Sequence, residues 1–412
     1  FLNLINGLCE EVKLTLFFNI KKSNISKILL FLLFLLFVLS IGPINYSDTA
    51  DVYVGYPYKF LILNSHFVDG NLNQGLMGIG DFANIFFIQE KTIWLIRTSQ
   101  FLPLILIFMF LKRRGTGNLN IFILLTSPVL IQWLTVGKNN FLSESCIAIS
   151  FLVWEENKNK KYLSSIFAII MIAIAFKISA VLVSLPILIY IFYFYKSQDQ
   201  FDWKKIHELI SIPLIISVIA LISILFYRFF LTGNPLFPFM ASIFNPGDKQ
   251  MLDWEITLKN WERTGFFPIW IFIPKSLGKV SSVLGPATLL IFLIIFSSIL
   301  RNFNFKKNMQ KVFSVQVLLL LTFSQARADY YACPLVLACA GFSSNSFSSF
   351  NFSKYKLINY GNQILRFFTF SQALLFFISS SYSIFLLGYV IFDYEKGMNK
   401  TAYNFYNSSK IL

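Results

Sequence analysis

The sequence predicts an all-α integral membrane protein with about 11 transmembrane helices, in a range of about 9 to 13. Of its 412 residues, 56% are hydrophobic and only 13% are charged, whereas a soluble chain carries about 25% charged residues. The mean hydropathy is +0.64. Apolar runs recur along almost the whole chain, and many reach ~17–25 residues, which is long enough to cross a bilayer. An ordinary soluble globular protein and a disordered chain are therefore excluded.

The apolar runs give the order of the expected helices. They cover 28–44, 92–111, 119–136, 141–154, 162–176, 178–195, a long run ending near 230, 281–300, 312–324, 330–342 and 365–392. The first run follows three lysines and lacks the small-residue cleavage site of a signal peptide, so it is read as a true span. Lys177 alone separates the fifth and sixth runs, and Gly233-Asn234-Pro235 ends the seventh.

The spans divide the chain into segments. We expect a cytoplasmic N-terminal segment at 1–27, a transmembrane core at 28–342 with large external loops at 45–91 and 231–280, a Ser/Phe/Asn-rich cytoplasmic connector at 343–364, a last transmembrane helix at 365–392 and an external tail at 393–412. The chain begins with Phe1 and not with Met, so we expect a fragment that could lack an upstream span.

The distribution of charge predicts the orientation. The formal net charge is +15, which in a soluble protein would suggest nucleic acid. With the N-terminus in the cytoplasm, 20 of the 35 Lys and Arg residues but only 7 of the 20 acids fall on the cytoplasmic side. This asymmetry follows the positive-inside rule. We therefore expect no nucleic-acid partner, and both large loops should lie outside the cytoplasm.

Cysteine and histidine are sparse. Cys9, Cys146, Cys333 and Cys339 are scattered, and the last three lie in apolar stretches, so they are expected to be small buried hydrophobes. Only two histidines occur, far apart, which argues against a His-based metal site. No cofactor is assigned; the external acids could bind a hard divalent cation, although no spacing requires one.

The first external loop carries the clearest candidates for chemistry. Asp48 and Asp51 stand three residues apart just beyond the first span, and on a helix that spacing puts both carboxylates on one face. They could serve as a general base, as metal ligands or as plain solvated charges. Tyr53 and Tyr56 follow directly and make the segment suited to a membrane interface.

Glycines end this loop. Gly70, Gly75, Gly78 and Gly80 do not form a P-loop, because no Lys-Ser/Thr pair follows them, so tight turns are the expected use. A surface or interface role is favoured over catalysis for His66. In the second loop, the run from Asp253 to Arg263, with two tryptophans, predicts a short amphipathic interfacial helix.

Several charges lie in or beside apolar runs, namely Arg97, Glu144, Lys177, Arg228 and Arg327. Such residues mark functional positions by default. Lys177 and Arg327 should lie near the outer face, where they could hold the phosphate of a lipid carrier. Arg228 is expected to snorkel to the interface, and Glu144 either pairs with Lys138 or acts directly.

The order of these features resembles a known family over about residues 28 to 342. The features are an acid after the first span followed by D-T…Y, the Lys-bearing AFKISAVLVSLP, the G-N-P-x-x-P turn at 233–238, Gly285-Pro286, and a late Gln325, Arg327, Tyr330 and Pro334. They resemble the C-type (GT-C) membrane glycosyltransferases, and more narrowly a bacterial group of uncharacterised membrane proteins related to those enzymes.

This resemblance implies transfer of a sugar from a polyprenyl-phosphate-linked donor to a cell-envelope polysaccharide, lipid or protein at the external face of the bacterial inner membrane. The partners would be the donor lipid and membrane lipid. Asp48 or Asp51 would be the general base. Lys177, Arg263 or Arg327 would neutralise the leaving phosphate. Tyr53, Tyr56, His66 and Glu144 would belong to the substrate loop.

The chain departs from the family pattern at three points. Val54 follows Tyr53 where the family has Tyr-His, two asparagines at 139–140 stand where an acid is common, and two residues separate Arg327 from Tyr330. Two other functions stay open: a transporter or flippase, and a polymerase-type membrane protein of surface-polysaccharide assembly. A transporter should show charges within its spans and broken helices, whereas the polar residues here gather in two same-side loops, which favours the enzyme.

Overall fold

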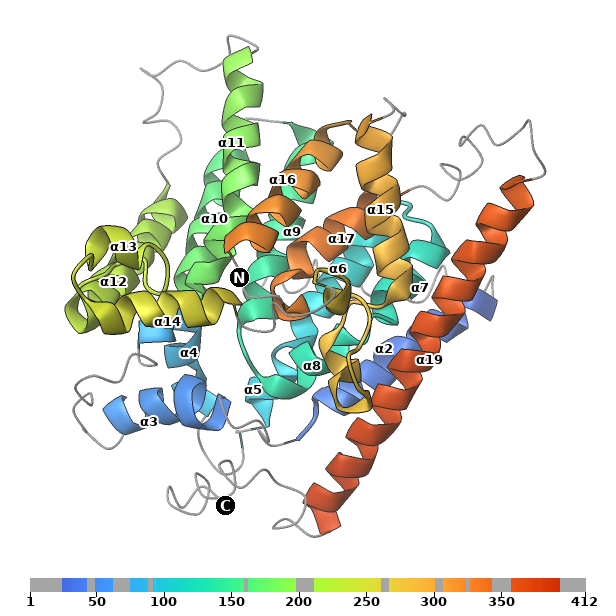
Figure 1. Ribbon diagram of the computed structural model, residues 1–412, viewed down its shortest axis with the longest axis horizontal. Helices are drawn as coiled ribbons and strands as arrows, with labels where there is room; N and C mark the ends of the chain where they lie inside the picture. The colour runs from blue at the N-terminus through green and yellow to red at the C-terminus, as the bar shows by residue number, and fades with distance from the viewer. Residues whose placement is uncertain are drawn as a thin grey trace.

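A computed structural model describes residues 24–42, 49–61, 75–87, 92, 94–158, 162–197, 211–260, 267–300, 307–323, 327–342 and 357–392. Within these ranges every regular element is a helix and none is a strand (Figure 1). In the described part of the chain, five helices are long and apolar enough to cross a membrane, or six if a bent helix pair counts as one span. The all-helical membrane class is thereby supported, and the count of about 11 spans stays a prediction.

The first helices follow the predicted runs closely. They are α2 (Asn24–Ser40), α5 (Leu95–Thr98), α6 (Phe101–Arg113), α7 (Asn118–Leu125), α8 (Val129–Val136) and α9 (Asn140–Asn157). The run predicted as one span at 119–136 is instead two helices that meet at 54°. Pro128 cannot donate the hydrogen bond that would continue α7. The break is packed against 283–284: Ser127 Oγ donates to the Leu284 carbonyl at 2.7 Å and Val129 N donates to that of Val283 at 2.9 Å.

The later helices overlap the predicted runs, although the last one begins at Leu357, inside the segment that was predicted to be a connector. They are α10 (Leu163–Phe176), η7 (Ile178–Ala180), α11 (Val181–Ser197), α12 (Ile212–Thr232), α15 (Pro286–Leu300), α16 (Lys307–Phe323), α17 (Ala332–Gly341) and α19 (Leu357–Phe392). Gly233 adopts a left-handed conformation (φ +69°) and ends α12 as a glycine C-cap does. Pro286 begins α15, where its fixed φ suits the first turn.

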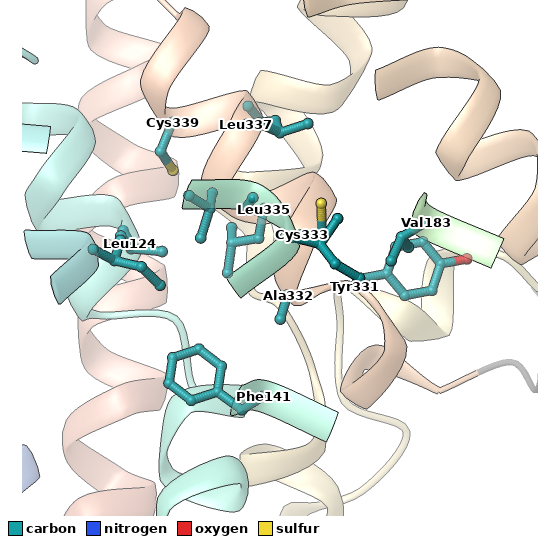
Figure 2. Packing of buried hydrophobic residues seen from close by; sticks show 14 of the residues in the cluster. Leu124, Phe141, Val183, Tyr331, Ala332, Cys333, Leu335, Leu337 and Cys339 are labelled. Atoms are coloured by element: carbon teal, nitrogen blue, oxygen red, sulfur yellow. The ribbon is translucent and has the colours of Figure 1, made fainter. Parts of the chain in front are cut away.

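α17 forms the centre of the core. Figure 2 shows its residues Cys333, Leu335, Leu337 and Cys339 packed among side chains of the surrounding helices, and Ala332 through Cys339 are almost completely buried. Cys333 and Cys339 are free thiols in this apolar setting, as the sequence predicted, and Cys146 is a free, half-buried thiol. In contrast, α12 and α19 expose large apolar side chains such as Phe226, Phe230 and Phe370, which suits contact with lipid.

The two large loops carry short helices. The first holds η3 (Thr49–Gly55), a π-helix, followed by α3 (Tyr56–Leu61), α4 (Ile79–Ala83) and η5 (Asn84–Phe87); the second holds α13 (Ala241–Phe244), α14 (Lys249–Asn260), η9 (Ile269–Ile271) and η10 (Leu277–Ser282). α14 lies where the sequence predicted an interfacial helix. In Figure 1, α3, α4, α13 and α14 gather on one side, by α12. Leu76 of the first loop packs against a buried cluster of Phe237, Ala241 and Met251 in the second, which joins the two loops.

Candidate functional site

Lys177 stands at the break between α10 and η7. Its backbone is extended (φ −151°), so α10 ends there before the chain enters α11. Its side chain is only 6% exposed, and Nζ lies 3.9 Å from the centre of the Tyr53 ring. Among the described residues Nζ has no hydrogen-bond partner. A buried ammonium in this state is costly, which makes Lys177 a candidate to bind an anion.

Tyr53 brings the first loop to this lysine. The ring lies on η3, is 9% exposed, and also has Lys138 Nζ at 5.2 Å from its centre. Two lysines thus converge on one aromatic ring, an arrangement in which each cation is attracted to the ring electrons. Asp51 precedes Tyr53 by two residues on the same π-helix, so its backbone lies beside the cluster. The side chain of Asp51, and the whole of Asp48, His66 and Arg263, lie outside the described residues.

Asp81 is the acid that the sequence did not single out. It lies on α4 and is completely buried. Its Oδ2 accepts from Gly78 N at 2.9 Å and its Oδ1 from Asn139 Nδ2 at 3.0 Å. Gln100 Nε2 in turn donates to Asn139 Oδ1 at 3.2 Å. Burial raises the pKa of the Asp81 carboxyl above its usual value, and the charge of nearby Lys177 opposes that shift.

The glycines around Asp81 allow a close approach between the loop and α10. A Cβ on Gly78 would overlap the backbone carbonyl of Phe176, the residue before Lys177. A Cβ on Gly80 would lie 2.9 Å from the Phe176 ring and 3.0 Å from the Asn139 amide. These glycines are therefore needed for packing beside Lys177, whereas the sequence suggested tight turns.

Arg228 has a role that differs from snorkelling. Its side chain is completely buried near the end of α12. It donates to the carbonyl of Phe237 and, through Nη2, to those of Met77 at 2.8 Å and Leu76 at 3.3 Å. The guanidinium therefore ties α12 to both large loops. Its charge also acts on Asp81 and Lys177.

The turn before α17 supplies further charges. Arg327 Nε lies 3.4 Å from Asp329 Oδ1, and Asp329 interacts electrostatically with Lys177. Both belong to the turn that includes η11 (Ala328–Tyr330). Tyr330 interacts electrostatically with Tyr53 and Arg327. The late Arg and Tyr motif is thus linked to Lys177 through Asp329 and Tyr53.

Glu144 and Tyr56 have structural partners. Glu144 is 2% exposed on α9, and its carboxylate accepts from the backbone N–H of Cys333 at 3.1 Å and from that of Ala332. It therefore caps α17, whose N-terminus favours a negative charge. The sequence predicts that Glu144 pairs with Lys138 or acts directly, and neither prediction includes this role. Tyr56 packs with Val52 and Met77, and Lys59 Nζ lies 5.6 Å from the centre of its ring.

The cluster combines cations and carboxylates at one end of the helices. Lys177, Lys138 and Arg327 lie near Tyr53 and Tyr330, while Asp81 and Asp329 balance part of their charge. Such a site can bind a phosphate and stabilise negative charge that develops on it. Among the described residues no group of three or more His, Cys, Asp or Glu side chains could hold a metal ion.

Sequence reasoning missed Asp81 and misjudged Arg228. The available signal was the G-x-G-D pattern, because two glycines directly before an acid indicate that its backbone approaches another element closely. For Arg228, an arginine one turn before a G-N-P turn could have indicated a donor for the loop carbonyls that follow. Comparison with family models, curated proteins and solved structures gave no match to this chain.

Proposed function

We propose that this chain is a membrane glycosyltransferase that moves a sugar from a polyprenyl-phosphate-linked donor to a surface polysaccharide, lipid or protein at the external membrane face. One observation carries the proposal. The Lys177 ammonium is buried at the end of a helix and has no hydrogen-bond partner among the described residues. A phosphate attached to a lipid chain would provide that partner at the depth where the membrane helices end.

In the proposed reaction, an acceptor hydroxyl attacks the anomeric carbon of the sugar. The bond between that carbon and the phosphate oxygen breaks, and the electron pair leaves with polyprenyl phosphate. Lys177 and Arg327 stabilise the charge that develops on the phosphate. Asp51 or Asp48 takes the acceptor proton. Asp51 is the better supported of the two, because it lies two residues from Tyr53, which contacts Lys177.

The proposed orientation rests on the charged residues at the helix ends that lie opposite the Lys177 cluster. There, Arg114 at the end of α6 pairs with Glu156 at 3.5 Å, and Lys158 pairs with Glu155 at 3.6 Å. These groups belong to the basic side of the sequence, which the positive-inside rule assigns to the cytoplasm. The Lys177 cluster, at the other ends, would then face outward, where lipid-linked sugars are used for the cell envelope.

A transporter or flippase is the second candidate, because of the 54° break between α7 and α8. Broken helices with unpaired backbone groups are typical of transporter sites. Here the break is packed against 283–284 and neither half carries a charged residue. Counterflow of a lipid-linked saccharide across vesicles containing the purified chain, without release of polyprenyl phosphate, would favour this candidate over the enzyme.

Binding of a short prenyl phosphate, an analogue of the polyprenyl phosphate carrier, tests the proposal. The probe is farnesyl phosphate, added to the purified chain in nanodiscs, with uncharged farnesol as its control. Loss of a charge-assisted hydrogen bond costs about 1.5–3 kcal/mol, so Lys177→Ala should weaken binding roughly 10-fold to 100-fold. Lys249→Ala removes an exposed lysine from α14 and should have no effect. Equal binding of farnesyl phosphate by wild type and Lys177→Ala would refute the phosphate site.

A further inference from the structure

Asp81 lies near Lys177, yet each of its two oxygens accepts a hydrogen bond from another donor. Oδ2 is held by Gly78 N and Oδ1 by Asn139 Nδ2. The carboxylate interacts electrostatically with Lys177, while Lys177 Nζ has no hydrogen-bond partner among the described residues. The pair thus has attraction between its charges without the hydrogen bond that usually forms between such groups.

We propose that Asp81 is a positioning residue that keeps the Lys177 ammonium charged and unoccupied, ready to bind an anion. This inference deepens the proposed function and rests on it, because the anion is the donor phosphate. A buried lysine with no acidic neighbour would lose its proton. A lysine in direct contact with a carboxylate would direct at least one of its three N–H donors to that carboxylate and be held by it. Asp81 avoids both results, because it supplies the charge while other donors hold its oxygens.

The surroundings fix Asp81 in this arrangement. Gly78 packs against the backbone of Phe176, the neighbour of Lys177, so the N–H that holds Oδ2 is positioned relative to the backbone of the lysine. Asn139 is oriented by Gln100, whose amide nitrogen donates to its oxygen. Both the oxygen and the nitrogen of the Asn139 amide therefore make hydrogen bonds, and the nitrogen must point at Asp81. The spacing between carboxylate and ammonium is thereby set by packing and not by their own contact.

The charge state of Lys177 can be measured without any ligand. The groups that act on Lys177 are Asp81 and Asp329, which favour its charged form, Arg228, which opposes it, and the Tyr53 ring. The experiment labels the full chain in nanodiscs with trace acetic anhydride at a series of pH values and follows Lys177 by mass spectrometry. Only the neutral amine reacts, so the midpoint of labelling reports loss of the proton. Lys249 serves as internal reference.

Asp81→Asn should move the midpoint of Lys177 labelling to lower pH by about one unit or more, because it removes a negative charge that favours the charged lysine. A shift of one unit corresponds to a tenfold change in the ratio of charged to neutral lysine. Asp253→Asn removes an exposed acid from α14 and should leave the midpoint unchanged. In the same Asp81→Asn chain, farnesyl phosphate binding should be weak at pH 8 and restored near pH 6. A role in folding alone would give no rescue by acid.

Two further variants cover the other outcomes. Asn139→Ala keeps the charge of Asp81 but frees Oδ1 to pair with Lys177, so labelling should slow and farnesyl phosphate binding should still fall about tenfold. In Lys177→Arg, whose guanidinium stays charged without help, adding Asp81→Asn should cost little binding. If Lys177 is labelled in Asp81→Asn and in Asn139→Ala as it is in the wild type, the proposed role of Asp81 is wrong. Binding of farnesyl phosphate that ignores Lys177 overturns the proposed function instead.

Discussion

Gly78 lies directly against the backbone carbonyl of Phe176, with no room between them for a Cβ atom. The contact joins the first large loop to the residue that precedes Lys177. The same glycine donates its N–H to Asp81, so one residue positions both members of the charge pair. The close packing at Gly78 and Gly80 and the hydrogen bond from Gly78 to Asp81 fall within four residues, which explains why the loop is rich in glycine at this point.

Gly78→Ala should therefore destabilise the chain and weaken phosphate binding. The methyl group would overlap backbone atoms that cannot rotate away, and overpacking of this kind costs about 1–3 kcal/mol. The midpoint of thermal unfolding, followed by size-exclusion chromatography of the detergent-solubilised protein, should fall. Gly117→Ala is the matched control, because a Cβ there meets nothing within 4 Å. A Gly78→Ala chain as stable as Gly117→Ala would contradict the packing argument.

Arg228→Leu should detach the two external loops from α12. The carbonyls of Met77 and Phe237 would be left in a buried setting without their donor, at about 1–3 kcal/mol for each unsatisfied group. We expect a lower unfolding temperature and faster cleavage of the loops by a protease added from the external side. If Arg228→Leu folded normally and lost only farnesyl phosphate binding, the arginine would be a ligand of the phosphate and not a structural tie.

Glu144→Gln and Glu144→Ala separate capping from chemistry. The Gln side chain keeps an oxygen that can accept from Ala332 N or Cys333 N, so it should retain most of the stability. The Ala variant leaves these N–H groups unpaired and should lose about 1–3 kcal/mol. Thermal unfolding of the two variants gives the comparison. Normal unfolding in both, with turnover lost in both, would instead assign Glu144 to the substrate.

Asp51→Asn and Asp48→Asn test the general base. Loss of a positioned base lowers turnover by about 10²–10⁴-fold, and we expect this from Asp51→Asn at normal protein levels in the membrane. Asp253→Asn, on the exposed face of α14, is the matched loss of an acid. The readout is release of polyprenyl phosphate in isolated membranes. If neither Asp48→Asn nor Asp51→Asn reduced the release, the assignment of the base to this loop would be wrong.

Much of the fold could be predicted from hydropathy and from turn residues. The ends of α12 at Gly233 and of α10 before Lys177 were read from the sequence, because glycine and a charged residue interrupt apolar runs visibly. The break at Pro128 was missed, since a single proline within an apolar run is also compatible with one kinked helix. Of the predicted site residues, Lys177 lies against the Tyr53 ring, and Arg327 pairs with Asp329, an acid that interacts with Lys177.

Asp81 could not be recognised from its position in the chain. In the sequence it is one of several acids in a polar loop, and such acids are usually solvated. In the fold it is held by Asn139, which Gln100 orients in turn, and Asn139 lies 58 residues away in the sequence. The same limit applies to Arg228, whose partners at 76–77 lie about 150 residues away. Long-range contacts of this kind are not encoded in local patterns.

Turnover of a defined donor tests the central claim most directly. The purified chain in nanodiscs is given polyprenyl-phosphate-linked hexose or pentose together with membrane-derived acceptors, and released polyprenyl phosphate is measured by mass spectrometry. We expect release by wild type and by Lys249→Ala, and a drop of about 10²–10³-fold in Lys177→Ala, which is the usual effect of losing one group that stabilises developing charge. Release that is equal in wild type and Lys177→Ala, or no release from any donor, would contradict the account.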